Sequence, residues 1–285
     1  MKLGIASSVY LSRYGVSEGA KKMKTHGYGY ADFQDLANPS TPFFTQDEDA
    51  FIAEIKRIRR DAENEGIYFW QSHGLWCWPP PACATPEELA KCVDDVKKGI
   101  RGSAAVGAKY FILHPLMPFG WQMFGDERVD EFFEINYNFF REVVAYAEKQ
   151  GVIICLENMP MPDLPLGSVK AIVDFVKKIN HSNLKICLDT GHVLVFGEQP
   201  SDAVRLIGRD LLATLHVHDN NGERDQHLDP YQGVCKWDDF VSALKEIGFE
   251  GVFSMETNAP KGDSPEEITN AEIKFAEMIK NMVKD

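Results

Sequence analysis

The segment LKICLDTGH, residues 184–192, joins an apolar run of strand length to a carboxylate, Asp189. Similar segments recur along the chain, and each ends on a residue that can bind a divalent metal: IYFWQSH at His73, KYFILH at His114, VIICLE at Glu157, LATLH at His216 and VFSME at Glu256. Enough chain for a helix separates consecutive segments. Because a parallel barrel places the carboxyl ends of all its strands on one face, these six side chains are predicted to converge there.

The rest of the chain continues this alternation of strand and helix. A first strand is expected at KLGIAS (2–7) and a second at YGYADFQ (28–34), which has Asp32, Gln34 and Asp35 near its end. Helix signals are predicted over about 17–26, 46–65 and 129–149, then after 85, 168, 201, 237 and 264. Near-continuous apolar strands are typical of a parallel sheet covered by helices. We therefore predict an α/β fold, a single (β/α)8 TIM barrel that spans residues 1–285 as one domain.

Composition and charge restrict the classes of partner. The chain has 30 basic and 43 acidic residues, a net charge of -13. Such a surface repels phosphate backbones, so nucleic acid is not expected as a partner. The sequence has no apolar run long enough for a bilayer and no signal-peptide core near its start, and its six cysteines form no CxxC pair. These features predict a cytoplasmic protein with no membrane partner, and they leave homo-oligomer formation open.

Four of the strand ends form the tightest predicted set: Glu157, Asp189, His216 and Glu256. They belong to the fifth to eighth strands, which are consecutive in the barrel wall. Burying several carboxylates without a cation is costly. Mixed imidazole and carboxylate ligands suit a transition metal better than Ca²⁺. We expect a divalent metal, Mn²⁺ or Zn²⁺ first, with Co²⁺, Mg²⁺ and Fe²⁺ as alternatives.

Further polar residues flank this set. His192 lies three residues past the sixth-strand aspartate, and Asp225 and His227 form an Asp-x-His segment after the seventh strand. In extended chain this spacing can place both side chains on one side. Asp225 and His227 either bind metal themselves or orient a ligand. His218, two residues past the seventh-strand histidine, is expected to be a hydrogen-bonding residue at the strand end.

Loop residues are candidates for substrate contacts. Aromatic side chains either stack on a carbohydrate at the barrel mouth or pack on its rim: these are Trp76, Trp78, Trp121 and Phe124. Asn158 is expected to contact substrate or to brace a ligand. Arg224 is a candidate contact for a phosphate or hydroxyl group.

Five motifs together resemble the xylose isomerase-like TIM-barrel superfamily: LEN (156–158), CLDTGH (187–192), HVHDN (216–220), DQH (225–227) and SME (254–256). This superfamily contains sugar (phosphate) isomerases and epimerases and the endonuclease IV type of apurinic-site nuclease. The epimerase branch implies one divalent ion on the four-residue set above, with Glu157 and Glu256 moving a proton at a sugar carbon. The nuclease branch implies three zinc ions on nine positions, all present here: His73, His114, Glu157, Asp189, His192, His216, Asp225, His227 and Glu256.

Some positions depart from the nuclease branch. Gly191 stands where that branch has a cysteine, and the residues after Glu157 and His114 lack its small-residue runs. The spacing of Arg224 does not match the arginine of many epimerases. We therefore expect a metal-dependent isomerase or epimerase acting on a sugar, sugar phosphate or inositol-like polyol. The alternatives are an endonuclease IV-like multi-zinc phosphodiesterase, a polyol dehydratase and a non-catalytic sugar-binding barrel.

Overall fold

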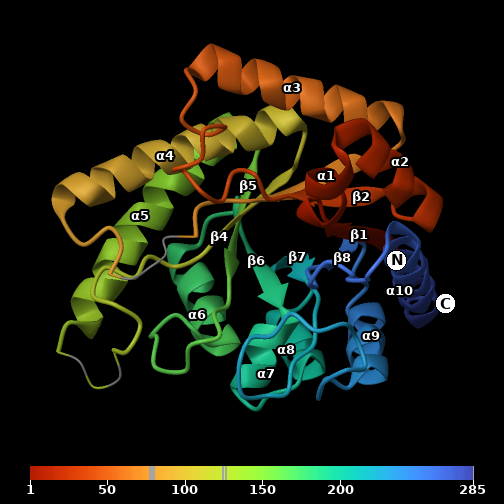
Figure 1. The fold of residues 1–285 in the computed structure, drawn as a ribbon. Helices are drawn as coiled ribbons and strands as arrows, with labels where there is room; N and C mark the ends of the chain where they lie inside the picture. The colour runs from red at the N-terminus through yellow and green to blue at the C-terminus, as the bar shows by residue number, and fades with distance from the viewer. Residues whose placement is uncertain (77–80, 124, 126, 285) are drawn as a thin grey trace.

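The computed structural model describes residues 1–76, 81–123, 125 and 127–284. Its eight strands are all parallel and form one nearly closed barrel, as predicted (Figure 1). Their bounds are β1 Lys2–Ala6, β2 Tyr30–Phe33, β3 Tyr68–His73, β4 Tyr110–Leu113, β5 Ile153–Glu157, β6 Leu184–Asp189, β7 Leu212–His216 and β8 Val252–Met255. Neighbours follow chain order, and β1 also pairs with β8.

The last gap in the barrel, between β7 and β8, is closed by a single bridge between Val217 and Met255. The Val217 N–H donates to the Ser254 carbonyl at 2.9 Å, and the Glu256 N–H donates to the Val217 carbonyl at 3.0 Å. The bridge therefore lies directly beside two of the predicted site residues, His216 and Glu256.

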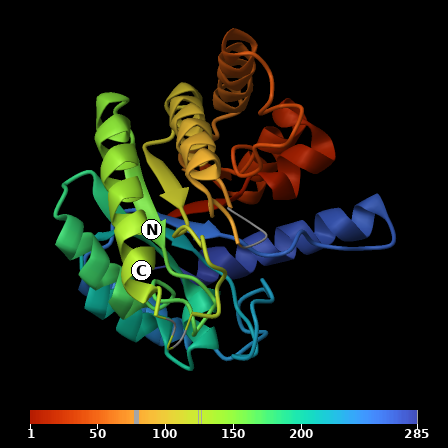
Figure 2. The same ribbon diagram turned by 90° about the vertical axis from the view of Figure 1, so that its left-hand side faces the viewer.

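Helices surround the barrel, as Figures 1 and 2 show. Their bounds are α1 Ser8–Tyr14, α2 Val16–His26, α3 Glu48–Asn64, α4 Pro86–Val106, α5 Val129–Lys149, α6 Val169–Ile179, α7 Thr190–Val195, α8 Pro200–Ile207, α9 Trp237–Glu246 and α10 Pro265–Met282. Predicted starts are confirmed by their caps: Thr85 and Glu88 form a capping box, and Ser168 and Ser264 each accept a backbone N–H.

Two short helices, α1 and α7, were not predicted. Helix α7 begins directly after β6, and its N-cap is Asp189, whose side chain accepts the His192 N–H at 2.7 Å. Its place at a strand end predicts a metal ligand, and the capping role of this aspartate was missed. Within the described parts of the chain, every helix is too short or too polar to span a lipid bilayer.

The barrel interior contains both apolar and polar side chains. Ile112, Cys155 and Cys187 form a small apolar cluster inside it, separate from the main core between strands and helices. Both thiols are buried and free. Gln71 and Asp32 are also buried: Gln71 donates to Asp32 at 3.1 Å, and Asp32 Oδ2 lies 2.9 Å from His216 Nε2 at the end of β7. A polar floor thus lies beneath the strand ends.

Candidate active site and metal centre

The carboxyl ends of the strands surround a cavity of about 280 Å³. The predicted site residues that line it come from strand ends and from loops: His73, His114, Glu157, His192, Asp225, His227 and Glu256. Asp189 and His216 are fully buried beside this lining. Because each strand end has a fixed place in the ladder, the residues that we predicted to converge do lie together.

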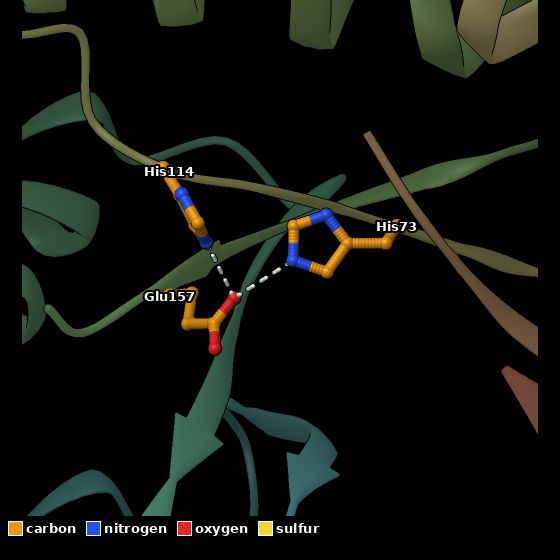
Figure 3. A group of neighbouring side chains, drawn as sticks. All are labelled: His73, His114 and Glu157. Carbon is orange, nitrogen blue, oxygen red and sulfur yellow. Dashed lines mark hydrogen bonds and ion pairs between the residues drawn. The ribbon is translucent and has the colours of Figure 1, made fainter. Parts of the chain in front are cut away.

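Glu157, at the end of β5, lies at the centre of what we call the inner cluster: His73, His114, Glu157, His216 and Glu256. Its Oε2 lies 3.1 Å from His114 Nε2 and 3.5 Å from His73 Nε2 (Figure 3). Its Oε1 lies 2.8 Å from His216 Nδ1. Burial opposes ionisation, but His216 and His114 outweigh it and hold the pKa of Glu157 well below its usual value.

His216 joins both predicted catalytic glutamates. Its Nδ1 lies 2.8 Å from Glu157 Oε1 and 3.1 Å from Glu256 Oε2. Its Nε2 lies 2.9 Å from Asp32 Oδ2. Burial acts to lower the pKa of His216, but the acidic groups around it, Cys187 and then Glu157 and Glu256, raise it well above its usual value. Without a cation, this imidazole is therefore protonated between carboxylates.

A second group, the outer cluster, consists of Asp189, His192, His218, Asp225 and His227. Asp225 Oδ2 lies 3.0 Å from His227 Nε2 and 3.4 Å from His192 Nε2. Asp189 Oδ2 lies 2.9 Å from His218 Nε2. The two clusters adjoin through His192, whose Nδ1 is 3.9 Å from Glu157 Oε1 and 3.7 Å from Asp189 Oδ1. Of the four residues predicted as the tightest set, His216 contacts both Glu157 and Glu256, whereas Asp189 is linked to Glu157 through His192.

Three of these histidines share one arrangement. In each of them Nδ1 lies within 2.8 Å of a backbone carbonyl oxygen. His73 contacts the carbonyl of Gly74, His192 that of Asn158, and His227 that of Glu256. A carbonyl only accepts, so Nδ1 donates and Nε2 is the free nitrogen. Each of these Nε2 atoms faces a carboxylate. Histidines that bind metals are held in this way, with one ring nitrogen on a carbonyl and the other on the ion.

The charges of the outer cluster follow from the same contacts. Burial acts against the charged form of His227, but the hydrogen bond to Asp225 raises its pKa to about 10. The pKa of His192 is raised to about 9, because Asp189 and Asp225 outweigh burial. The pKa of Asp225 is lowered by His192 and His227 against the effect of burial. Protons on imidazoles that face carboxylates occupy positions that a divalent cation can take.

The donor set fits a transition metal. It contains only imidazole nitrogens and carboxylate oxygens, which bind Zn²⁺ and Mn²⁺. Among the described residues, buried atoms without a hydrogen-bond partner include Asp32 Oδ1 and Asp225 Oδ1. Buried polar atoms of this kind are rare unless a water or an ion satisfies them.

The other predicted contacts fall in different places. Trp76 lines the cavity, with its ring centroid 6.1 Å from that of His73. Trp121 and Arg224 are exposed and are not among the lining residues. Trp78 and Phe124 lie outside the described residues. Asn158 is a brace: its amide donates to the Asp189 carbonyl at 3.0 Å and accepts the Asp189 N–H at 2.9 Å.

Two site residues of the second strand were missed. Asp32 bonds His216 as described above, and Gln34 donates to Glu256 Oε1 at 3.0 Å. Gln34 Oε1 in turn accepts the Ser8 hydroxyl at 2.6 Å. The signal was present in the sequence, since polar residues two apart at a strand end point to the same side of the sheet.

The chain was compared with known proteins and shows similarity to several of them. The chain is 31% identical over 236 residues to D-psicose 3-epimerase of Ruminiclostridium cellulolyticum, covering 79% of this chain and 73% of that protein. It is 27% identical to a probable endonuclease 4 of Halothermothrix orenii, covering 75% of each. A solved structure, the IOLI protein with a bound zinc atom, matches 99% of this chain and 98% of its own with a TM-score of 0.74 and 19% identity. Residues 20–279 match the family described as xylose isomerase-like TIM barrel, and the chain belongs to that family.

Proposed function

We propose that this protein is a metal-dependent isomerase or epimerase that moves a proton at a carbon of an unphosphorylated sugar or polyol. The observation that carries the proposal is the pair Glu157 and Glu256 at the cavity, both within 3.1 Å of His216 Nδ1. Proton transfer on the two sides of one carbon needs two acid–base groups at one site, and two carboxylates can fill these roles. The psicose epimerase relative supports this class of reaction.

The proposed metal site consists of Glu157, His216 and Glu256 of the inner cluster, with Asp189 as the fourth ligand expected from the resemblance. A divalent ion bound there, Mn²⁺ or Zn²⁺, would polarise a substrate carbonyl and make the neighbouring C–H more acidic. His73 and His114 would add donors on the β3 and β4 side of Glu157. The protein contributes fixed positions for these groups, because each stands at or directly after a strand end.

The two glutamates differ in ways that suit different roles. Glu157 is almost fully buried and touches three imidazoles, whereas the Glu256 side chain is 16% exposed at the cavity. Gln34 donates to Glu256 Oε1, which leaves Oε2 toward His216. We propose that Glu256 removes the proton, since the more accessible carboxylate reaches a substrate C–H with less rearrangement, and that Glu157 passes a proton from a neighbouring imidazole, His216 or His114, to the opposite side of the carbon.

The cavity wall indicates a neutral substrate. Among the described residues that line the cavity there is no lysine or arginine. Its remaining wall is apolar and consists of Trp76, Met117, Met159, Pro160 and Met161. A phosphate group is normally bound by arginine, lysine or a helix N-terminus. An apolar wall instead suits the C–H face of a free sugar.

A second candidate, a multi-metal phosphodiesterase, is favoured by one observation. The outer cluster presents His192 and His227 to Asp225, and these are positions that the nuclease branch uses for zinc. The probable endonuclease 4 of Halothermothrix orenii, 27% identical to this chain, supports this second candidate. The absence of lysine and arginine from the described lining counts against a phosphodiester substrate.

One pair of assays separates the two functions. The protein is loaded with Mn²⁺ or Zn²⁺ and incubated in D₂O with free ketohexoses, and in parallel with their phosphates. We expect deuterium on the carbon next to the carbonyl of a free ketohexose, detected by NMR, and no incision of an abasic-site duplex. Metal-dependent incision that is lost in Glu157→Gln, without turnover of any sugar, would establish the phosphodiesterase instead.

A further inference from the structure

The imidazole of His218 lies directly against Gly191, at the junction of β7 and α7. A Cβ atom built on Gly191 would lie 2.0 Å from His218 Cε1 and 2.4 Å from its Nδ1. Contacts this short do not occur, so any other residue at 191 would displace the imidazole. The backbone at Gly191 is not in the left-handed region. Glycine is therefore required here for space and not for conformation.

Three further contacts fix the position of His218. The Thr190 hydroxyl donates to the His218 carbonyl at 2.7 Å and accepts its N–H at 2.9 Å. The ring of His227 stacks on that of His218, with centroids 4.1 Å apart and planes 15° apart. The side chain is completely buried. His218 is thus held by its backbone, by its ring face and by the gap at Gly191.

In this position His218 contacts Asp189. His218 Nε2 lies 2.9 Å from Asp189 Oδ2 and donates a hydrogen bond to this carboxylate oxygen. The other ring nitrogen, Nδ1, has no hydrogen-bond partner among the described residues. The contact with Asp189 is therefore the hydrogen bond that this ring makes within the described part of the chain. The other oxygen of Asp189, Oδ1, accepts the His192 N–H at 2.7 Å.

We infer that His218 is a positioning residue for Asp189, and that Gly191 is the residue that makes room for it. The inference rests on the proposed function, because the orientation of Asp189 matters only if the site holds an ion. Two donors, one on each oxygen, hold the carboxylate in a single orientation. Residues that orient metal ligands in this way typically change metal affinity by about 10–100-fold when removed.

The test is the affinity for Co²⁺, which is measured by calorimetry, and the coordination of the bound ion, which is measured by its visible absorption spectrum. We expect His218→Ala to weaken Co²⁺ binding by about 10–100-fold and to alter the spectrum. His218→Gln keeps an N–H donor at similar reach and should recover most of the affinity. His181→Ala is the matched control, because that imidazole lies outside the cavity and its Nδ1 accepts the Asn183 N–H.

A double-mutant cycle tests the role of Gly191. Gly191→Ala should weaken Co²⁺ binding by displacing the imidazole, whereas Gly191→Ala combined with His218→Ala should bind no more weakly than His218→Ala alone. Thermal denaturation shows whether each variant is folded. If His218→Ala does not fold, the variants His218→Gln and Gly191→Ala decide the matter.

The possible failures are distinguishable. Wild-type protein that binds no Co²⁺, Mn²⁺ or Zn²⁺ would contradict the proposed function. Wild-type protein that binds Co²⁺, together with folded His218 and Gly191 variants of unchanged affinity and spectrum, would overturn only the positioning role.

Discussion

The inner and outer clusters border the same cavity but are built from different parts of the fold. Every residue of the inner cluster stands at a strand end or one position beyond it, and His216 and Glu157 are almost fully buried. The outer cluster combines Asp189 with α7 and with the segment between β7 and α9, where the Asp225 and His227 side chains are 25% and 35% exposed. The barrel ladder positions the first cluster, and local loop contacts position the second.

This difference separates a site built on the barrel wall from one built on a loop. The segment that carries Asp225 and His227 is held by the buried carboxylate of Asp219. That carboxylate accepts the Gly233 N–H at 3.0 Å and the Trp237 indole N–H at 3.0 Å, and also the Cys235 N–H. Changes to the inner cluster should therefore affect chemistry, and changes to the loop should affect the outer cluster first.

The largest effect is expected from Glu256→Gln in the inner cluster. An amide cannot take up a carbon-bound proton, so turnover should fall by about 10²–10⁴-fold, while the amide oxygen keeps some metal binding. Turnover and deuterium incorporation from D₂O are measured with a free ketohexose. Turnover equal to that of the wild type would show that Glu256 is a ligand only, and the two-glutamate mechanism would be wrong.

A smaller loss is expected from Gln34→Ala, which leaves Glu256 Oε1 without its donor. We expect kcat to fall by about 10–100-fold with little change in KM, because the glutamate is present but less well oriented. Ser8→Ala is the control, because the Ser8 hydroxyl donates to Gln34 and not to Glu256, so its loss should affect kcat less. A change in KM alone would place Gln34 in substrate binding instead.

Asp219→Asn should separate the clusters. The amide offers an N–H to backbone and indole donors, so the free energy of unfolding should fall by roughly 3 kcal/mol, given about 1.5–3 kcal/mol for a hydrogen bond to a charged group. Because Asp219 holds the loop and not the strand ends, we expect metal affinity and turnover to fall less than in Gln34→Ala. Denaturant unfolding, metal analysis and turnover measure these effects. A loss of metal or of turnover as large as in Gln34→Ala would show that the loop also positions the inner cluster.

The smallest effect concerns pH and the metal-free protein. The folded pKa of His227, about 10, lies above the value of about 6.5 expected in the unfolded chain. A raised histidine pKa stabilises the fold fully below the unfolded value, and this contribution is lost as pH rises through the folded value. The midpoint of urea unfolding should therefore decline from about pH 6.5 to 10, and Asp225→Asn should flatten the decline. Saturating metal should also flatten it, by replacing the proton.

The strands and the inner cluster were predictable for the same reason. Apolar runs that end on His73, Glu157 or Glu256 mark both the strand and the face on which it ends. The spacing of Asp32 and Gln34 marked them as residues of one strand face, but the partner of Asp32 is a histidine 184 residues away, a pairing that no local pattern signals. The place of Arg224 could not be predicted, because loop conformation depends on contacts such as those of Asp219 and not on periodicity.

The single bridge between β7 and β8 makes that junction the seam of the barrel. Other neighbouring strands share several register pairs, whereas within the described residues β7 and β8 are joined by one bridge, that of Val217 with Met255 and its two backbone hydrogen bonds. His216 stands on one edge and Glu256 on the other, and His216 Nδ1 lies 3.1 Å from Glu256 Oε2. An ion held by both residues would work as a clasp across the seam. Local opening between β7 and β8 and dissociation of the ion would then be coupled. The bound ion would thus stabilise the junction of the barrel that has the fewest backbone pairs among the described strands.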